Sequence, residues 1–118
     1  VRAKQDITPT DIGLDFINML NPVKFKMRSS TEWGEELGVP EQHRYELPKE
    51  KQNRVNDGFI AQEVKAIMDE LDVSFSSWIE DSNGRQKLDY GRFVVPLVKA
   101  VQELSAQVEE LKLKLKEK

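Results

Sequence analysis

Residues 94–118 read VVPLVKAVQELSAQVEELKLKLKEK, and this segment carries the clearest structural pattern in the sequence. Its apolar residues recur at alternating steps of three and four, which is the spacing of heptad positions a and d on a helix. These positions, called the seam below, are Val94, Leu97, Val101, Leu104, Val108, Leu111 and Leu115. The neighbouring positions in the last two heptads are mostly polar, so an isolated helix would expose its apolar stripe to water. The sequence therefore predicts a long helix that associates with partner helices through the seam.

The same pattern leaves three points open. The stripe can also pack inside the same chain as ordinary core, although a stripe limited to a and d is narrower than the face that a globular helix usually buries. Valine at a with leucine at d favours two strands in parallel coils, but this preference is weak over so short a seam. Pro96 predicts either a first-turn position in a helix that begins near Val95 or a kink in a helix that begins at Asp89.

Near the start of this predicted helix the apolar face is wider than the seam. It includes Phe93, Val95, Val98 and Ala100, which predicts packing of this part of the helix against the rest of the chain. At the other end of the chain, residues 8–11 offer a threonine cap and a first-turn proline. The apolar spacing from Ile12 to Leu20 then predicts a helix, which Pro22 ends. Alternation over residues 23–27 predicts a half-buried strand.

The middle of the chain combines a polar segment with a helix and a hairpin. Residues 29–57 lack periodicity and are predicted to be an irregular surface insertion. A helix is predicted to open at residues 58–64 and to end near Leu71, with apolar residues in a 4-3-4 rhythm. The Asn83-Gly84 pair predicts a hairpin between strands in residues 73–80 and 85–90.

These elements predict an α+β fold that is mainly α. A small helical head with a short β-hairpin and strands would occupy residues 1–92, including the irregular insertion at residues 29–57. Residues 93–118 would form a long C-terminal helix in a coiled coil, and the heptad pattern alone leaves its number of strands open.

Composition argues against several functions. The chain of 118 residues is 38% apolar and 33% charged, so a single copy has little apolar surface to bury. Its net charge of −3 comes from interspersed signs, which predicts no nucleic-acid ligand. No cysteine is present, and the single histidine, His43, lies among polar residues, so we expect a solvated side chain, no metal site and no cofactor. No apolar run is long enough to span a bilayer, so no membrane partner is expected.

Several segments in register resemble one known family. They are GFIAQEV at residues 58–64, LDY at residues 88–90, LVKAVQEL at residues 97–104, RxKxDI at residues 2–7, and the first helix followed by PVKF at residues 22–25. This arrangement is similar to the peptidase S74 family, the intramolecular chaperone of endosialidase-type phage tailspikes and tail fibres. The resemblance covers nearly the whole chain except residues 29–56.

The resemblance implies a homotrimer that brings three chains of a fibre precursor into register, helps the upstream fibre part to fold and then cuts itself off. It implies a Ser-Lys dyad in which Lys4 is the general base, while the serine would lie two positions before Val1 and outside the chain. Lysine accepts a proton only if burial or a nearby cation such as Arg2 lowers its pKa. Without the resemblance, Lys4 would be interpreted as a solvated charge in a polar arm.

The enzyme assignment is therefore limited to a single-turnover serine peptidase in the precursor, and the released fragment is not expected to be an enzyme. The resemblance places the domain in the host cytoplasm during virion assembly, then released from the mature tail fibre or loosely associated with it. Two other functions remain open: a trimerising self-cleaving module of a cellular transcription factor resembling myelin regulatory factor, and a plain coiled-coil adaptor without cleavage.

Overall fold

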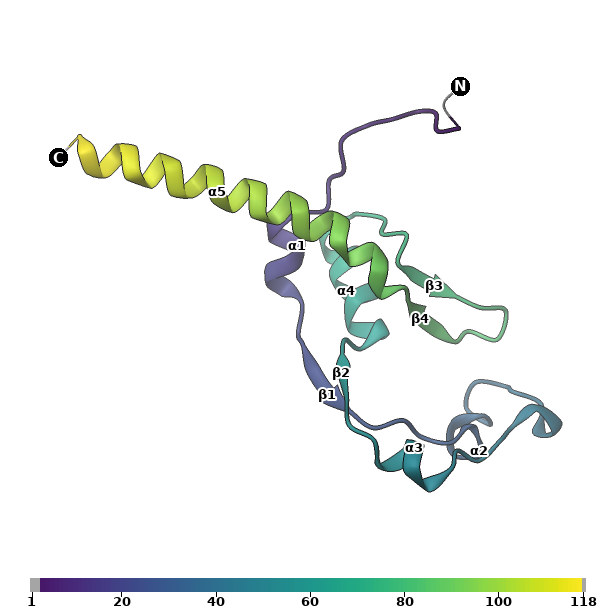
Figure 1. The fold of residues 1–118 in the computed structure, drawn as a ribbon. Coiled ribbons are helices and arrows are strands. Elements are labelled where there is room, and N and C mark those ends of the chain that lie inside the picture. The colour runs from purple at the N-terminus through teal and green to yellow at the C-terminus, as the bar shows by residue number, and fades with distance from the viewer. Residues whose placement is uncertain (1–2, 118) are drawn as a thin grey trace.

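The C-terminal stretch forms one continuous helix, α5, over Val94–Lys116. A computed structural model describes residues 3–117, and Figure 1 shows α5 projecting from a small head. The helix has 23 residues, which at 1.5 Å per residue gives a length of about 35 Å. The Cα radius of gyration is 19.5 Å, whereas a compact chain of this length would have about 13.5 Å. The single chain is therefore elongated, mainly because of α5.

The head is built from two helices and the beginning of α5. Helix α1 spans Leu14–Met19 and α4 spans Ala61–Leu71. Side chains from these helices and from the segments beside them form the core, whose members are Ile12, Phe16, Val64, Ile67, Met68, Phe75 and Phe93. Helix α4 ends at Leu71, as predicted. The chain leaves the helix there because Asp72 adopts a left-handed conformation with φ of 53°.

Two small antiparallel sheets complete the secondary structure. Strand β1, Val23–Phe25, pairs with β2, Asn56–Gly58, so the two ends of the insertion lie side by side. Strand β3, Trp78–Glu80, pairs with β4, Gln86–Leu88, which confirms the predicted hairpin. Of the Asn-Gly pair in its turn, only Gly84 has a positive φ, of 78°.

The insertion is more regular than the sequence predicted. It contains helix α2, Ser30–Trp33, the 3-10 helix η1, Glu41–His43, and helix α3, Lys49–Asn53. Two buried serines organise it. The Ser30 hydroxyl accepts a hydrogen bond from the Tyr45 backbone N–H at 2.7 Å, and the Ser29 hydroxyl accepts one from the Leu47 N–H at 2.8 Å. Polar contacts of this kind have no apolar periodicity, so the pattern analysis missed these elements.

Two predicted helix starts are wrong. Residues 8–11 do not begin the first helix, because the Thr10 hydroxyl instead accepts a hydrogen bond from the Ile12 N–H at 3.3 Å, a local turn that competes with helix. The second helix does not open at Gly58, which pairs in β2, and it starts three residues later at Ala61.

The beginning of α5 resolves the question about Pro96. The 3-10 helix η2, Tyr90–Phe93, leads into α5, so Pro96 lies in the first turn of α5 and is buried, and the kink alternative is wrong. Phe93 and Ala100 pack into the head as predicted, but Val95 and Val98 stay 59% and 51% exposed. Only half of the widened apolar surface therefore serves the head.

The observed fold confirms the mainly helical class with small β elements and a long C-terminal helix. The division into residues 1–92 and 93–118 stays a prediction. Within the part that the structure describes, no helix is both long and apolar enough to cross a membrane.

Candidate functional site

The seam lies on the outside of the single chain. Its seven side chains are between 43% and 69% exposed, with Val108 the least and Leu115 the most exposed. The alternative in which this stripe packs inside the same chain as core is therefore wrong. Monomeric proteins rarely leave a continuous apolar stripe of this length in water, so the seam is the candidate interaction surface of the chain.

A different face of α5 holds the helix to the head. Pro96 and Ala100 are buried against it, and α1 crosses α5 at this level (Figure 1). Seam residues and head-facing residues thus occupy separate faces of one helix. A partner helix can cover the seam without displacing the head.

Two polar side chains of α5 bind the segment around the start of α1, and we call this contact the α1–α5 junction. The Glu103 carboxylate Oε1 accepts a hydrogen bond from the Leu14 backbone N–H at 3.2 Å, and the Lys99 Nζ donates to the Thr10 carbonyl oxygen. A Cβ at Gly13 would overlap Glu103 Oε1, so glycine permits this close approach. Gly13 is the N-cap residue of α1 and has no side chain to accept a backbone hydrogen bond. The Glu103 carboxylate therefore caps α1 in its place.

The family-like segments at residues 58–64 and 88–90 meet in an aromatic cluster. The Tyr90 hydroxyl accepts a hydrogen bond from the Phe59 backbone N–H at 3.0 Å, and a Cβ at Gly58 would overlap that hydroxyl. The Phe59 ring stacks on Phe93 with centroids 5.1 Å apart, and Phe93 meets Phe75 edge to face at 5.0 Å. These residues thus join the start of α4 to the start of α5, which is a structural role.

Asp89 fixes the turn that leads into α5. Its side chain accepts a hydrogen bond from the Gly91 N–H at 3.2 Å and pairs with Arg92 at 3.0 Å. Its backbone exchanges hydrogen bonds with the fully buried Ser77, whose hydroxyl donates to the Asp89 carbonyl oxygen at 2.6 Å. The direction in which α5 leaves the head is therefore set by several bonds.

Lys4 lies in an exposed arm before the head. The arm leaves the head where α1 crosses α5, and in Figure 1 its described residues extend away from the direction in which α5 projects. Among residues 3–117, no hydrogen bond or ion pair of the Lys4 side chain is formed. Arg2, the second predicted contributor, lies outside the described residues. The structure therefore leaves the role of Lys4 as general base a prediction.

Other candidate side chains have ordinary surroundings. Glu63 on α4 accepts a hydrogen bond from the Asn21 side chain at 3.3 Å. His43 is exposed in η1. Within residues 3–117, no three His, Cys, Asp or Glu side chains gather where they could hold a metal ion.

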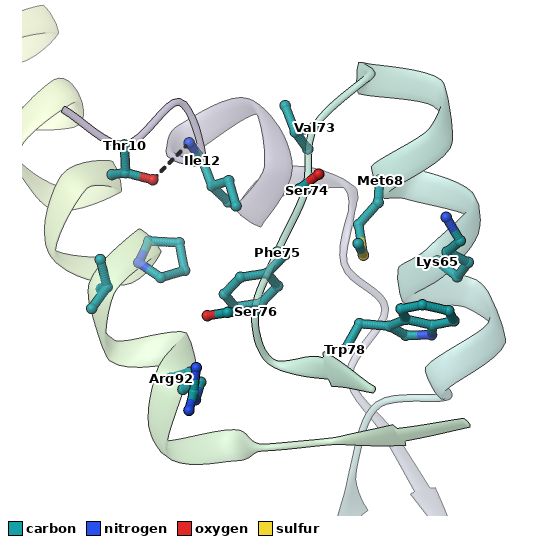
Figure 2. Close-up of a pocket in the computed structure, with 12 residues that line it drawn as sticks. Thr10, Ile12, Lys65, Met68, Val73, Ser74, Phe75, Ser76, Trp78 and Arg92 are labelled. Carbon is teal, nitrogen blue, oxygen red and sulfur yellow. Dashed lines mark hydrogen bonds between the residues drawn. The ribbon is translucent and has the colours of Figure 1, made fainter. Parts of the chain in front are cut away.

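A cavity of about 710 Å³ lies beside α4, the segment before β3 and the start of α5. Figure 2 shows Phe75, Met68 and Trp78 along it, with the Lys65 Nζ 5.0 Å from the Trp78 ring centroid. Lys65 pairs with Asp69 at 2.7 Å and Arg92 pairs with Asp89, so both cations at its edge already have partners. The cavity therefore offers apolar surface with hydroxyl groups and paired cations at its edge.

Comparison with known proteins gives the family. No curated protein and no solved structure shows significant similarity to the chain. The model of the peptidase S74 family, described as the chaperone of endosialidase, matches residues 1–73. This range contains three of the resembling segments, at residues 2–7, 22–25 and 58–64, whereas those at residues 88–90 and 97–104 lie beyond it. Since the match covers more than half of the chain, the protein belongs to the peptidase S74 family of endosialidase chaperones.

Proposed function

We propose that this chain is the homotrimeric intramolecular chaperone of a phage tail fibre or tailspike precursor, released by a single self-cleavage at its N-terminal side. The observation that carries the proposal is the exposed seam on a helix that the head holds by another face. The family describes a chaperone, and the seam supplies a physical means by which three copies come together.

Association by itself can assist folding of the upstream chains. Tethering three chains through their C-terminal helices raises their effective local concentration to the order of millimolar. The entropic cost of starting a three-chain fold then falls, and no ATP is needed. In this proposal the partners are two further copies of the chain and the fibre part of the same precursor, and assembly takes place in the host cytoplasm.

The α1–α5 junction supports a link between assembly and cleavage. Its two bonds, from Glu103 and Lys99, tie the residues directly after the arm to α5. Three associated α5 helices would therefore bring three arms to defined places around one axis. Each arm carries one Lys4, and the upstream fibre would continue from its N-terminal side.

In the proposed cleavage, Lys4 accepts the proton of a serine two positions before Val1. A lysine has an ordinary pKa of about 10.4, so it must be desolvated or placed near a cation to act as a base at neutral pH. In the single chain Lys4 is exposed. Closure of the trimer around the arm would supply the desolvation, so that only assembled chains are cut.

A longer precursor that contains the proposed serine tests both the role of Lys4 as general base and the coupling of cleavage to assembly. Lys4→Gln should assemble as a trimer and remain uncut, while the matched surface variant Lys49→Gln should assemble and be cut. Leu104→Asp combined with Leu111→Asp should be monomeric and uncut. The readouts are the product mass, its N-terminal sequence and sedimentation of the same samples.

Two outcomes would contradict the proposal separately. Normal cleavage of the Lys4→Gln precursor would remove Lys4 as the general base. Undiminished cleavage by monomeric seam variants would remove the coupling between assembly and cleavage.

A further inference from the structure

A second concave site lies between the insertion and the tip of the β3–β4 hairpin. Its volume is about 180 Å³. Its cationic and aromatic lining residues are Arg28, Lys51, Arg54, Arg85, Trp33 and Tyr45. No carboxylate lines this cavity, although the whole chain has a net charge of −3. We call it the basic cavity.

Backbone and aromatic contacts hold part of the wall of the basic cavity. The Trp33 indole N–H donates to the Arg28 carbonyl oxygen at 3.1 Å, and the Arg85 guanidinium carbon lies 5.1 Å from the Trp33 ring centroid. Tyr45 is fixed by its backbone bond to the buried Ser30 hydroxyl. The Trp33 ring and the Arg85 guanidinium are therefore placed against each other before any ligand arrives, and the backbone at Tyr45 is fixed.

The cavity keeps an excess of positive charge. Arg28 is 3.4 Å from Glu32, a long contact between two exposed side chains. Asp81 is near Arg85: the Arg85 backbone N–H chiefly lowers the pKa of Asp81, and the charges of Lys87 and Arg85 add to this. Lys51 and Arg54 have no ion pair among residues 3–117. Two of the four cations thus remain available to a ligand.

We infer that the basic cavity binds a carboxylate side chain of an acidic peptide segment. Guanidinium groups bind carboxylates through paired hydrogen bonds, and a neighbouring aromatic ring can cover the apolar stem of a glutamate. At about 180 Å³ the cavity is smaller than the roughly 300–1,000 Å³ typical of small-molecule sites, so it suits one side chain rather than a nucleotide. Its cations converge on one hollow, whereas nucleic-acid sites extend along a patch or stripe.

The acidic segment has two possible sources with the same chemistry: the upstream part of the precursor or a neighbouring copy of this chain. The inference does not depend on the seam or on Lys4. If the titration shows no binding of the acidic peptide, the proposed chaperone function is therefore unaffected. If the proposed function is refuted, the inference about the basic cavity is likewise unaffected.

The test titrates the full 118-residue chain with a capped Gly-Glu-Glu-Gly peptide and with a Gly-Gln-Gln-Gly control. The chain has two tryptophans, so two indole N–H signals report separately in a ¹⁵N-correlated spectrum. Trp33 lines the basic cavity and Trp78 does not, so only the Trp33 signal should shift, and only with the glutamate peptide. Added salt should weaken this shift because the cations are exposed.

Variants locate the binding. Arg54→Gln and Lys51→Gln should each weaken binding of the glutamate peptide about tenfold, near the lower end of values for charged hydrogen bonds. Lys87→Gln removes a cation from the same hairpin as Arg85 but outside the cavity, and it should change binding less than about twofold. Far-ultraviolet circular dichroism confirms that each variant is folded.

Three results would overturn the inference: no shift of the Trp33 signal, equal weakening by Lys87→Gln, or stronger binding of a short oligothymidylate than of the peptide. If the peptide binds as expected, sedimentation of a Lys51→Glu/Arg54→Glu double variant identifies the source. Weaker self-association assigns the carboxylate to a neighbouring copy, and unchanged self-association assigns it to the upstream part of the precursor.

Discussion

Two leucines of α5 provide a matched test of the seam. Leu111 belongs to the seam, whereas Leu113 lies two residues later at heptad position f, and each is 59% exposed in the single chain. Leu111→Ala and Leu113→Ala therefore make the same chemical change on the same helix at the same exposure. Only the seam position would be buried by partner helices.

The magnitude follows from the exposed fraction. Replacing leucine by alanine removes three carbons, each worth about 0.8 kcal/mol when buried. Because 59% of the Leu111 side chain is still exposed before association, about 1.4 kcal/mol per chain is lost from the association free energy. Three chains make this about 4 kcal/mol for a trimer, which lowers its association constant about a thousandfold.

Sedimentation equilibrium over a micromolar concentration series measures this effect. The unchanged protein and Leu113→Ala should show the same trimer-to-monomer transition, while Leu111→Ala should shift it to higher concentration. The reasoning is refuted if the unchanged chain is a stable folded monomer throughout the series. It is also refuted if Leu113→Ala weakens association as much as Leu111→Ala.

Further predictions concern the head, with unfolding measured at one fixed protein concentration. Glu103→Ala and Gly13→Ala should each lower the free energy of unfolding by about 1 kcal/mol, because both remove the cap of α1. The double variant should lose little more than either single variant, and additive losses would contradict a shared contact. Tyr90→Phe should cost about 1 kcal/mol in denaturant unfolding, because the Phe59 N–H loses its acceptor, and an unchanged midpoint would argue against this role. The Arg85 backbone N–H chiefly lowers the pKa of Asp81 below its ordinary value of 3.8. The Asp81 carboxylate therefore stabilises the fold above pH 3.8, and this stabilisation is lost as the pH falls through the lowered pKa. Acid unfolding curves of Asp81→Asn should accordingly be flatter in this pH range, and curves identical to those of the unchanged protein would show that Asp81 contributes nothing.

Much of the candidate site could be predicted because the decisive signal is periodic. The seam follows from residues spaced three and four apart, which lie on one face of any helix. The end of α4 near Leu71 and the β3–β4 hairpin were predicted for the same reason, since turn residues and periodicity act over a few neighbours. Helix starts were less predictable, as residues 8–11 show, because a local turn at Thr10 competes with a helix cap.

Contacts between residues far apart in the sequence could not be predicted from the spacing of residue types. Glu103 is a polar residue beside the seam, yet its carboxylate caps α1 across 89 residues of sequence. The four cations of the basic cavity come from the segment just before the insertion, from the insertion itself and from the hairpin, and no spacing links them. The net charge of −3 gives no indication of a local cluster of cations, because it sums over the whole chain.

The amino-acid order alone determined that the chain ends in a helix with a valine and leucine stripe, because side-chain spacing fixes the faces of a helix wherever it lies. Tertiary structure decided which of those faces the head covers, which chain segment receives the Glu103 carboxylate and where the scattered cations converge. The physical reason is that burial and hydrogen bonding between remote segments depend on how the elements pack together, which no local pattern records.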